Sequence, residues 1–128
     1  MKYVNRNGFT VMEVLVSMII LTIGILGLAP LIMVSIYGNS FSNDMTQANA
    51  LAQREVETLV NQKDYGTMPY IAVVDSVNGV YKVTRTVEDQ TTNASVPVGL
   101  AKITVVISWT DKKALLRTVN YSTLKPMI

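Results

Sequence analysis

One apolar segment dominates the N-terminal third of the chain. Between Phe9 and Tyr37 the only charged side chain is that of Glu13. As an α-helix this segment would be about 43 Å long, which exceeds the roughly 30 Å hydrocarbon thickness of a bilayer. The pattern therefore predicts a membrane-spanning helix over residues 9–37.

After residue 38 apolar side chains recur at the spacing of one helix face. They are Met45, Ala48, Ala52, Val56 and Leu59, with Leu51 and Val60 beside them. Such a stripe is typical of an amphipathic helix that packs on a core, and it predicts a helix over about 43–63. We expect Gly38-Asn39-Ser40 to interrupt the chain between the two helical parts and Gly66 to stop the second.

Three segments of the C-terminal half, at 80–88, 100–110 and 114–124, alternate apolar and polar residues. Alternation of this kind predicts an antiparallel sheet over about residues 80–124 with one buried face. The short connection at 111–113 predicts a hairpin between the last two strands, and Trp109 falls on the buried face. The fold class is therefore α+β. Its long N-terminal helix spans a membrane in its first half, and its amphipathic second half packs on a small antiparallel sheet.

Two stretches, at 64–78 and 89–99, lack this regularity. The first contains the apolar run 71–74, which is short enough to be either a strand or part of a loop. We interpret both stretches as solvated connectors.

Composition removes several kinds of chemistry. The chain has no Cys and no His, which excludes disulfides, thiolate metal sites and the commonest general base. The formal charge of +2 comes from Lys2 and Arg6, because the remaining basic residues only balance the 9 acidic ones. We predict no catalytic residue, metal site, cofactor or direct nucleic-acid contact.

Lys2 and Arg6 precede the apolar segment, and the next basic residue is Arg54. By the positive-inside rule, the N-terminal leader is cytoplasmic and the rest of the chain lies outside. The segment is too long for a secretory signal peptide and has no small-residue cleavage site at its end. A plain N-terminal anchor, with Glu13 tolerated near its cytoplasmic end, is one interpretation.

The junction between the leader and the apolar segment favours a different interpretation. Residues 8–16 read GFTVMEVLV, and this run resembles the processing site of type IV prepilins and of the pseudopilins of type II secretion. The resemblance implies that a prepilin peptidase removes residues 1–8 by cutting between Gly8 and Phe9. The same enzyme would then methylate the new amine of Phe9. It also implies a pilin-like fold, with residues 38–128 as the head.

Glu13 would be the fifth residue of the processed chain. A carboxylate without a partner among apolar helices is costly. The resemblance implies that Glu13 meets the Phe9 amine of a neighbouring subunit during assembly, although a pair within one chain satisfies the same requirement.

Gly24, Gly27 and Pro30 make residues 23–30 the weakest helical stretch of the segment, since Gly costs about 1 kcal/mol and Pro about 3 kcal/mol in a helix interior. Either this stretch bends or melts when the subunit joins a filament, or it is a static kink whose glycines allow close helix contact.

Two further runs resemble minor pilins of the PilV type, the type IV pilus modification proteins. They are IGILGLAP at 23–30 and ISWTD at 107–111. The resemblance implies a structural subunit that helps to initiate or modify a type IV pilus, rather than an enzyme. A minor pseudopilin of a type II secretion system is the alternative. By analogy with pilins, the two irregular stretches become candidate contact surfaces.

The resemblance also implies partners and a location. The partners would be other pilins and minor pilins through the N-terminal helix, the prepilin peptidase, an assembly platform of the inner membrane, and membrane lipid before assembly. The location would be the bacterial inner membrane, as a single-pass protein with its head outside the cytoplasm, and then a pilus or periplasmic filament.

Overall fold

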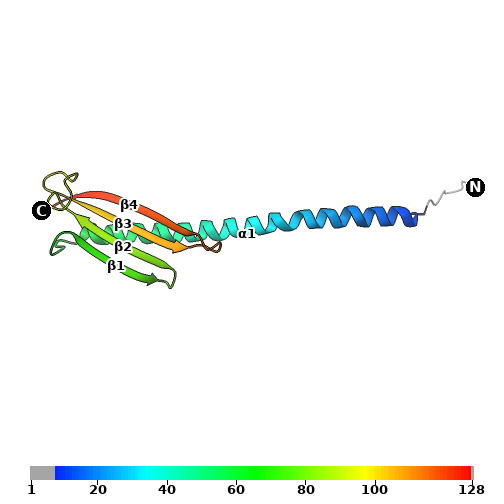
Figure 1. The fold of residues 1–128 in the computed structure, drawn as a ribbon, viewed down its shortest axis with the longest axis horizontal. Coiled ribbons are helices and arrows are strands. Elements are labelled where there is room, and N and C mark those ends of the chain that lie inside the picture. Colours follow the sequence, from blue (N-terminus) through cyan, green and yellow to red (C-terminus); the bar gives the residue numbers. More distant parts are fainter. Residues whose placement is uncertain (1–7, 128) are drawn as a thin grey trace, which may run out of the picture. The chain divides into compact units, whose positions relative to one another are not determined.

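The computed structural model describes residues 8–127, so the leader up to residue 7 lies outside the described residues. In chain order the elements are α1 (Val11–Asn61), β1 (Tyr70–Val77), β2 (Tyr81–Glu88), β3 (Leu100–Thr110) and β4 (Leu116–Pro126). The strands form one antiparallel sheet in the order β1-β2-β3-β4. Figure 1 shows the sheet lying along the last part of α1. The predicted α+β fold is confirmed.

The chain divides into two compact units between Asn39 and Ser40. Up to Asn39, the described residues are almost entirely α1. From Ser40 onward, the last part of α1 and the sheet form a unit that we call the head.

The interruption expected at residues 38–40 is wrong, because all three residues are helical in α1. A single glycine costs a helix only about 1 kcal/mol, and Asn and Ser cost less. Helix formation is cooperative, so a short weak stretch between two good helical segments stays helical. α1 ends at Asn61, slightly before the end near residue 63 that the apolar stripe predicted.

The sheet is larger than predicted, because it contains a fourth strand. The apolar run 71–74 belongs to β1, which pairs with β2 through partners such as Ile71 and Thr86. The register shifts between Val74 and Val77, and Ser76 has a positive φ of 64°. This irregular edge strand has no clean alternation, which explains why the sequence pattern left it open. The predicted hairpin is confirmed by the pairing of β3 with β4.

The core of the head lies between α1 and the inner face of the sheet. Ala48, Ala52 and Leu59 are the most buried apolar residues of the helix stripe. The sheet contributes alternate residues of β2 and β3, namely Tyr81, Val83, Val87, Ala101, Ile103, Val105, Ile107 and Trp109. Trp109 is 2% exposed and meets the Tyr81 ring edge-on at 5.9 Å between centroids, so its predicted burial is confirmed.

One ion pair crosses this core. Arg85 Nη2 lies 2.6 Å from Glu55 Oε2, and the two side chains are 24% and 11% exposed. Glu55 occupies the same helix face as Ala52 and Leu59, and Arg85 lies between Val83 and Val87 on the inner face of β2. This pair was not predicted from the sequence, although both residues fall at positions that the periodicity assigns to the core.

We expect the head, produced as a fragment that begins at Ser40, to fold alone. Within it, Trp109→Ala should lower the free energy of unfolding by about 3–5 kcal/mol, because the removed ring leaves a cavity in the core. That loss is a large part of the total for a small domain. Thermal and denaturant unfolding would measure it. Wild-type stability in the variant would contradict the packing described here.

Arg85→Met should destabilise the head by about 3 kcal/mol, because it leaves the Glu55 carboxylate in the core without a counter-charge. The double variant Glu55→Leu/Arg85→Met should recover most of this loss, since apolar side chains then replace both charges. Denaturant unfolding of the single and double variants measures the coupling. If the two substitutions were additive, the ion pair would contribute nothing.

Candidate functional site

The predicted cleavage site lies just before α1. Gly8 and Phe9 precede the helix in non-helical chain, and Phe9 is 82% exposed. A Cβ added to Gly8 would meet no atom of the chain within 4 Å. The fold itself therefore does not require glycine at position 8. A requirement for glycine there would have to come from an external partner, such as the active site of a peptidase.

Thr10 is the N-cap of α1. Its Oγ1 accepts a hydrogen bond of 3.2 Å from the backbone N–H of Glu13, and this satisfies one of the free donors at the start of the helix. Thr10 and Glu13 have the spacing of a capping box, and a carboxylate in the first turn also interacts favourably with the helix dipole. This role of Thr10 was not predicted from the sequence, although the Thr-x-x-Glu spacing is a known signal of a helix start.

The Glu13 carboxylate is exposed and has no hydrogen bond or ion pair with any residue in the range 8–127. Its backbone is bound on both sides, because Ser17 Oγ donates to the Glu13 carbonyl at 2.8 Å. The first turn of α1 thus holds the residue in place while its charge remains available to another group.

The side chains after Glu13 form an apolar surface on all sides of the helix. Each large hydrophobic residue of α1 from Val14 to Ile36 is about half exposed or more. An 18-residue window of α1 has a mean hydropathy of 2.6, none of it is buried, and α1 is long and apolar enough to cross a membrane. Such a surface needs an apolar environment, which a bilayer or other helices can supply.

Gly24, Gly27 and Pro30 all lie within this part of α1. A Cβ on either glycine would meet nothing within 4 Å, so no contact within the described chain explains them. Pro30 remains helical in this structure, and local melting or bending at this stretch stays a prediction.

The two predicted connectors differ in structure. β1 (Tyr70–Val77) takes up most of the stretch 64–78, whereas 89–99 is an irregular loop that is fixed by its own side chains. The Asp89 carboxylate accepts hydrogen bonds from Thr91 Oγ1 at 2.6 Å and from Thr92 N at 3.0 Å, and Val96 is only 1% exposed. The hydrogen bond from Thr91 is the largest cause of the lowered pKa of Asp89.

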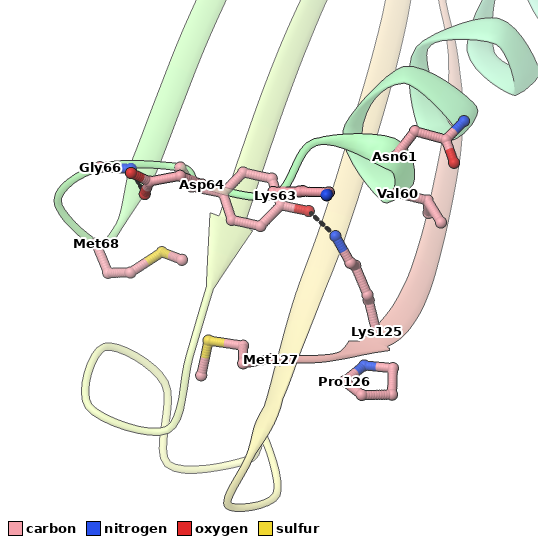
Figure 2. Close-up of a pocket in the computed structure, with 10 residues that line it drawn as sticks. Val60, Asn61, Lys63, Asp64, Gly66, Met68, Lys125, Pro126 and Met127 are labelled. Atoms are coloured by element: carbon pink, nitrogen blue, oxygen red, sulfur yellow. Dashed lines mark hydrogen bonds between the residues drawn. The ribbon is translucent and has the colours of Figure 1, made fainter.

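An open pocket of about 770 Å³ lies at the C-terminal end of α1. Figure 2 shows Lys125 reaching from the end of β4 toward the loop that follows the helix. Lys125 Nζ donates to the Gln62 carbonyl at 2.6 Å and to Tyr65 Oη at 3.3 Å. The ammonium therefore satisfies a carbonyl just past the helix end, so its role is structural.

Within residues 8–127, no three His, Cys, Asp or Glu side chains are grouped to hold a metal ion. Among the described residues, the first turn of α1 is where a lone carboxylate begins an exposed apolar surface, and we take this turn as the candidate functional site.

Comparison with known proteins also points to the start of α1. Residues 4–29 match the family model of the prokaryotic N-terminal methylation motif. The match supports a precursor of the type IV pilin-like and pseudopilin class, and it suggests a structural subunit rather than an enzyme. It does not support the narrower resemblance to PilV. No curated protein and no solved structure matches the chain.

Replacing Gly8 by Leu should block processing, because the peptidase would have to accept a bulky side chain at the scissile bond. The fold should be unaffected, since the site has open space. Mass spectrometry of the wild-type cellular protein should show N-methylated Phe9 at the N-terminus. A filament-associated form that begins at Met1 or Lys2 would contradict the assignment.

Proposed function

We propose that this chain is the precursor of a minor pilin, a structural subunit that helps to initiate or modify a type IV pilus. One observation carries the proposal. The matched methylation motif leads directly into an exposed apolar helix whose lone carboxylate, Glu13, has no side-chain partner among the described residues.

Cleavage between Gly8 and Phe9 creates the missing partner, because it converts the peptide nitrogen of Phe9 into a cationic amine. In the membrane Glu13 lies near the cytoplasmic end of the helix, where its charge is tolerated. Once the helix leaves the lipid and packs among other helices, a charge without a partner costs several kcal/mol. The Phe9 amine of a neighbouring subunit removes this cost only at one axial position, so the pair selects the register of assembly.

The narrower choice of a minor pilin rests on two short runs and on the absence of cysteine. Two runs, at 23–30 and 107–111, resemble PilV-type sequences, and the chain has no cysteine with which to form the C-terminal disulfide loop of major pilins. In this proposal the protein is first a single-pass protein of the bacterial inner membrane with its head outside the cytoplasm. It meets the prepilin peptidase and the assembly platform there, and then enters the filament through contacts with other pilins.

A minor pseudopilin would share the motif and the fold. Neighbouring genes distinguish the two systems, because a pilus subunit is expected among pilus genes and a pseudopilin among those of type II secretion.

Glu13→Val should leave membrane insertion and cleavage intact, since it removes a charge from the apolar segment and does not change Gly8. Incorporation into filaments should fall, because the Phe9 amine is left without its partner. The measurement is the ratio of this protein in sheared filaments to that in membranes.

Glu57→Val is the matched control, because Glu57 is exposed on the part of α1 that belongs to the head. It should leave the ratio unchanged. If Glu13→Val and wild type partition equally, Glu13 is a tolerated charge in a plain anchor and the proposal fails.

A further inference from the structure

β1 lies at the edge of the sheet and has a strand on one side only. It pairs with β2, and no other described residue binds the backbone groups along its outer edge (Figure 1). Its regular part is 70–74, because the register shifts after Val74 and Ser76 has a positive φ. Unpaired N–H and C=O groups along such an edge can form hydrogen bonds with a further strand.

Two rows of side chains across the outer face of the sheet change from apolar at β1 to polar at β4. Ile71 and Val73 begin these rows, and they are 62% and 50% exposed. The partners in the row of Ile71 are Thr86, Thr104 and Ser122, and those in the row of Val73 are Thr84, Val106 and Asn120. The two apolar side chains at the β1 edge lie outside the core, so packing within the head does not explain them.

The segment 70–74 also carries no charge. Edge strands that avoid association commonly contain charged residues or proline. β4, at the other edge, contains Arg117 and Lys125 and ends at Pro126. In β1 the first charged residue is Asp75, which pairs with Lys82 at 3.1 Å and lies beyond the regular part. The regular part of β1 therefore lacks the protection that β4 has.

This segment is complementary to itself in the antiparallel orientation. When two copies pair with Ala72 opposite Ala72, Ile71 of each copy faces Val73 of the other on the outer face. On the inner face, Tyr70 of each copy faces Val74 of the other. Apolar side chains that face each other across two strands stabilise the pair.

We propose that the segment 70–74 is a dimerisation site, at which β1 of one copy pairs antiparallel with β1 of a second copy about a two-fold axis at Ala72. The register places Asp75 opposite Pro69, so no like charges oppose each other. The inference concerns the head alone, and it depends neither on membrane insertion nor on Glu13. Five residues from each copy make a small interface, so the association is weak and increases with the local concentration of the chain.

The test uses the full chain in membranes. The chain has no cysteine, so one introduced cysteine reports on one position. In the proposed register the two Ala72 Cα atoms are about 4.5–5.5 Å apart, which is within the range of a disulfide. Ala72→Cys should therefore give a cross-linked dimer when it is oxidised with copper phenanthroline. Ser122→Cys is the matched control, because Ser122 is exposed on the opposite edge in the row of Ile71, and it should give little dimer.

Two differently tagged forms of the chain determine the register. Ile71→Cys in one form and Val73→Cys in the other should give a mixed dimer, because these positions face each other. Ile71→Cys alone should react far less. Its two copies lie on a diagonal about 7–8 Å long, which is too far for a disulfide.

A charge at the edge should disrupt the contact. Val73→Lys in the Ala72→Cys protein should abolish the cross-link, because it places an ammonium group at the apolar edge. The fold should be unaffected, since Val73 is half exposed. Ser122→Lys adds the same charge at the other edge and should have no effect.

Several results would overturn the inference. These are no dimer of Ala72→Cys, equal dimer formation by Ala72→Cys and Ser122→Cys, and no effect of Val73→Lys. A mixed dimer of Ile71→Cys with Ser122→Cys would indicate that β1 pairs with β4 of the next copy instead.

Glu13→Val distinguishes this contact from the proposed function. In the Ala72→Cys protein it should leave the cross-link intact, even where it lowers incorporation into filaments. A cross-link that Glu13→Val abolishes and Val73→Lys does not would assign the proximity of the copies to their N-terminal helices, and the dimerisation site would be wrong.

Discussion

The head depends on the close approach of α1 to the inner face of β2 and β3. Ala48 and Ala52 make this approach possible, because both are fully buried and neither has a side chain beyond Cβ. The space they leave is filled from the sheet by branched and aromatic residues, with Trp109 and Tyr81 in edge-to-face contact. Interiors packed in this way tolerate little change in volume. The strands are therefore fixed to the helix, and the turn 111–115 and the loop 89–99 are held at opposite ends of β3.

Two carboxylates in apolar surroundings, those of Glu55 and Glu13, differ in whether they have a partner within the chain. Glu55 has a partner in its own chain, Arg85, at 2.6 Å, so its charge is compensated when the head folds. Glu13 forms hydrogen bonds only through its backbone, and no described residue provides a counter-charge for its carboxylate. A buried pair that forms within one chain contributes to folding, whereas a charge left open in the monomer can only be compensated by another group or by water. The difference supports the view that Glu13 serves a contact made after folding.

Periodicity predicted most of this architecture and failed where periodicity was absent. The burial of Trp109 followed from strict alternation in a central strand, which has one face on the core. β1 escaped this reasoning because Ile71 and Val73 are exposed apolar residues on an edge strand with a register shift. Glu55 was missed for a different reason. A charged residue on an apolar stripe is normally assigned to solvent, and only the opposite charge of Arg85 across the core makes its position favourable.

At the N-terminus the sequence was more informative than the fold. Gly8, Phe9 and Glu13 fall within the matched methylation motif, and no contact among the described residues explains their identity. In the proposed function they are recognised by an external enzyme and by other subunits. The capping role of Thr10 is the exception, since it is a local property of helix initiation that the hydrogen bond to Glu13 makes visible. The motif is therefore visible in the sequence alone, whereas the interactions that stabilise the head are visible only in its packing.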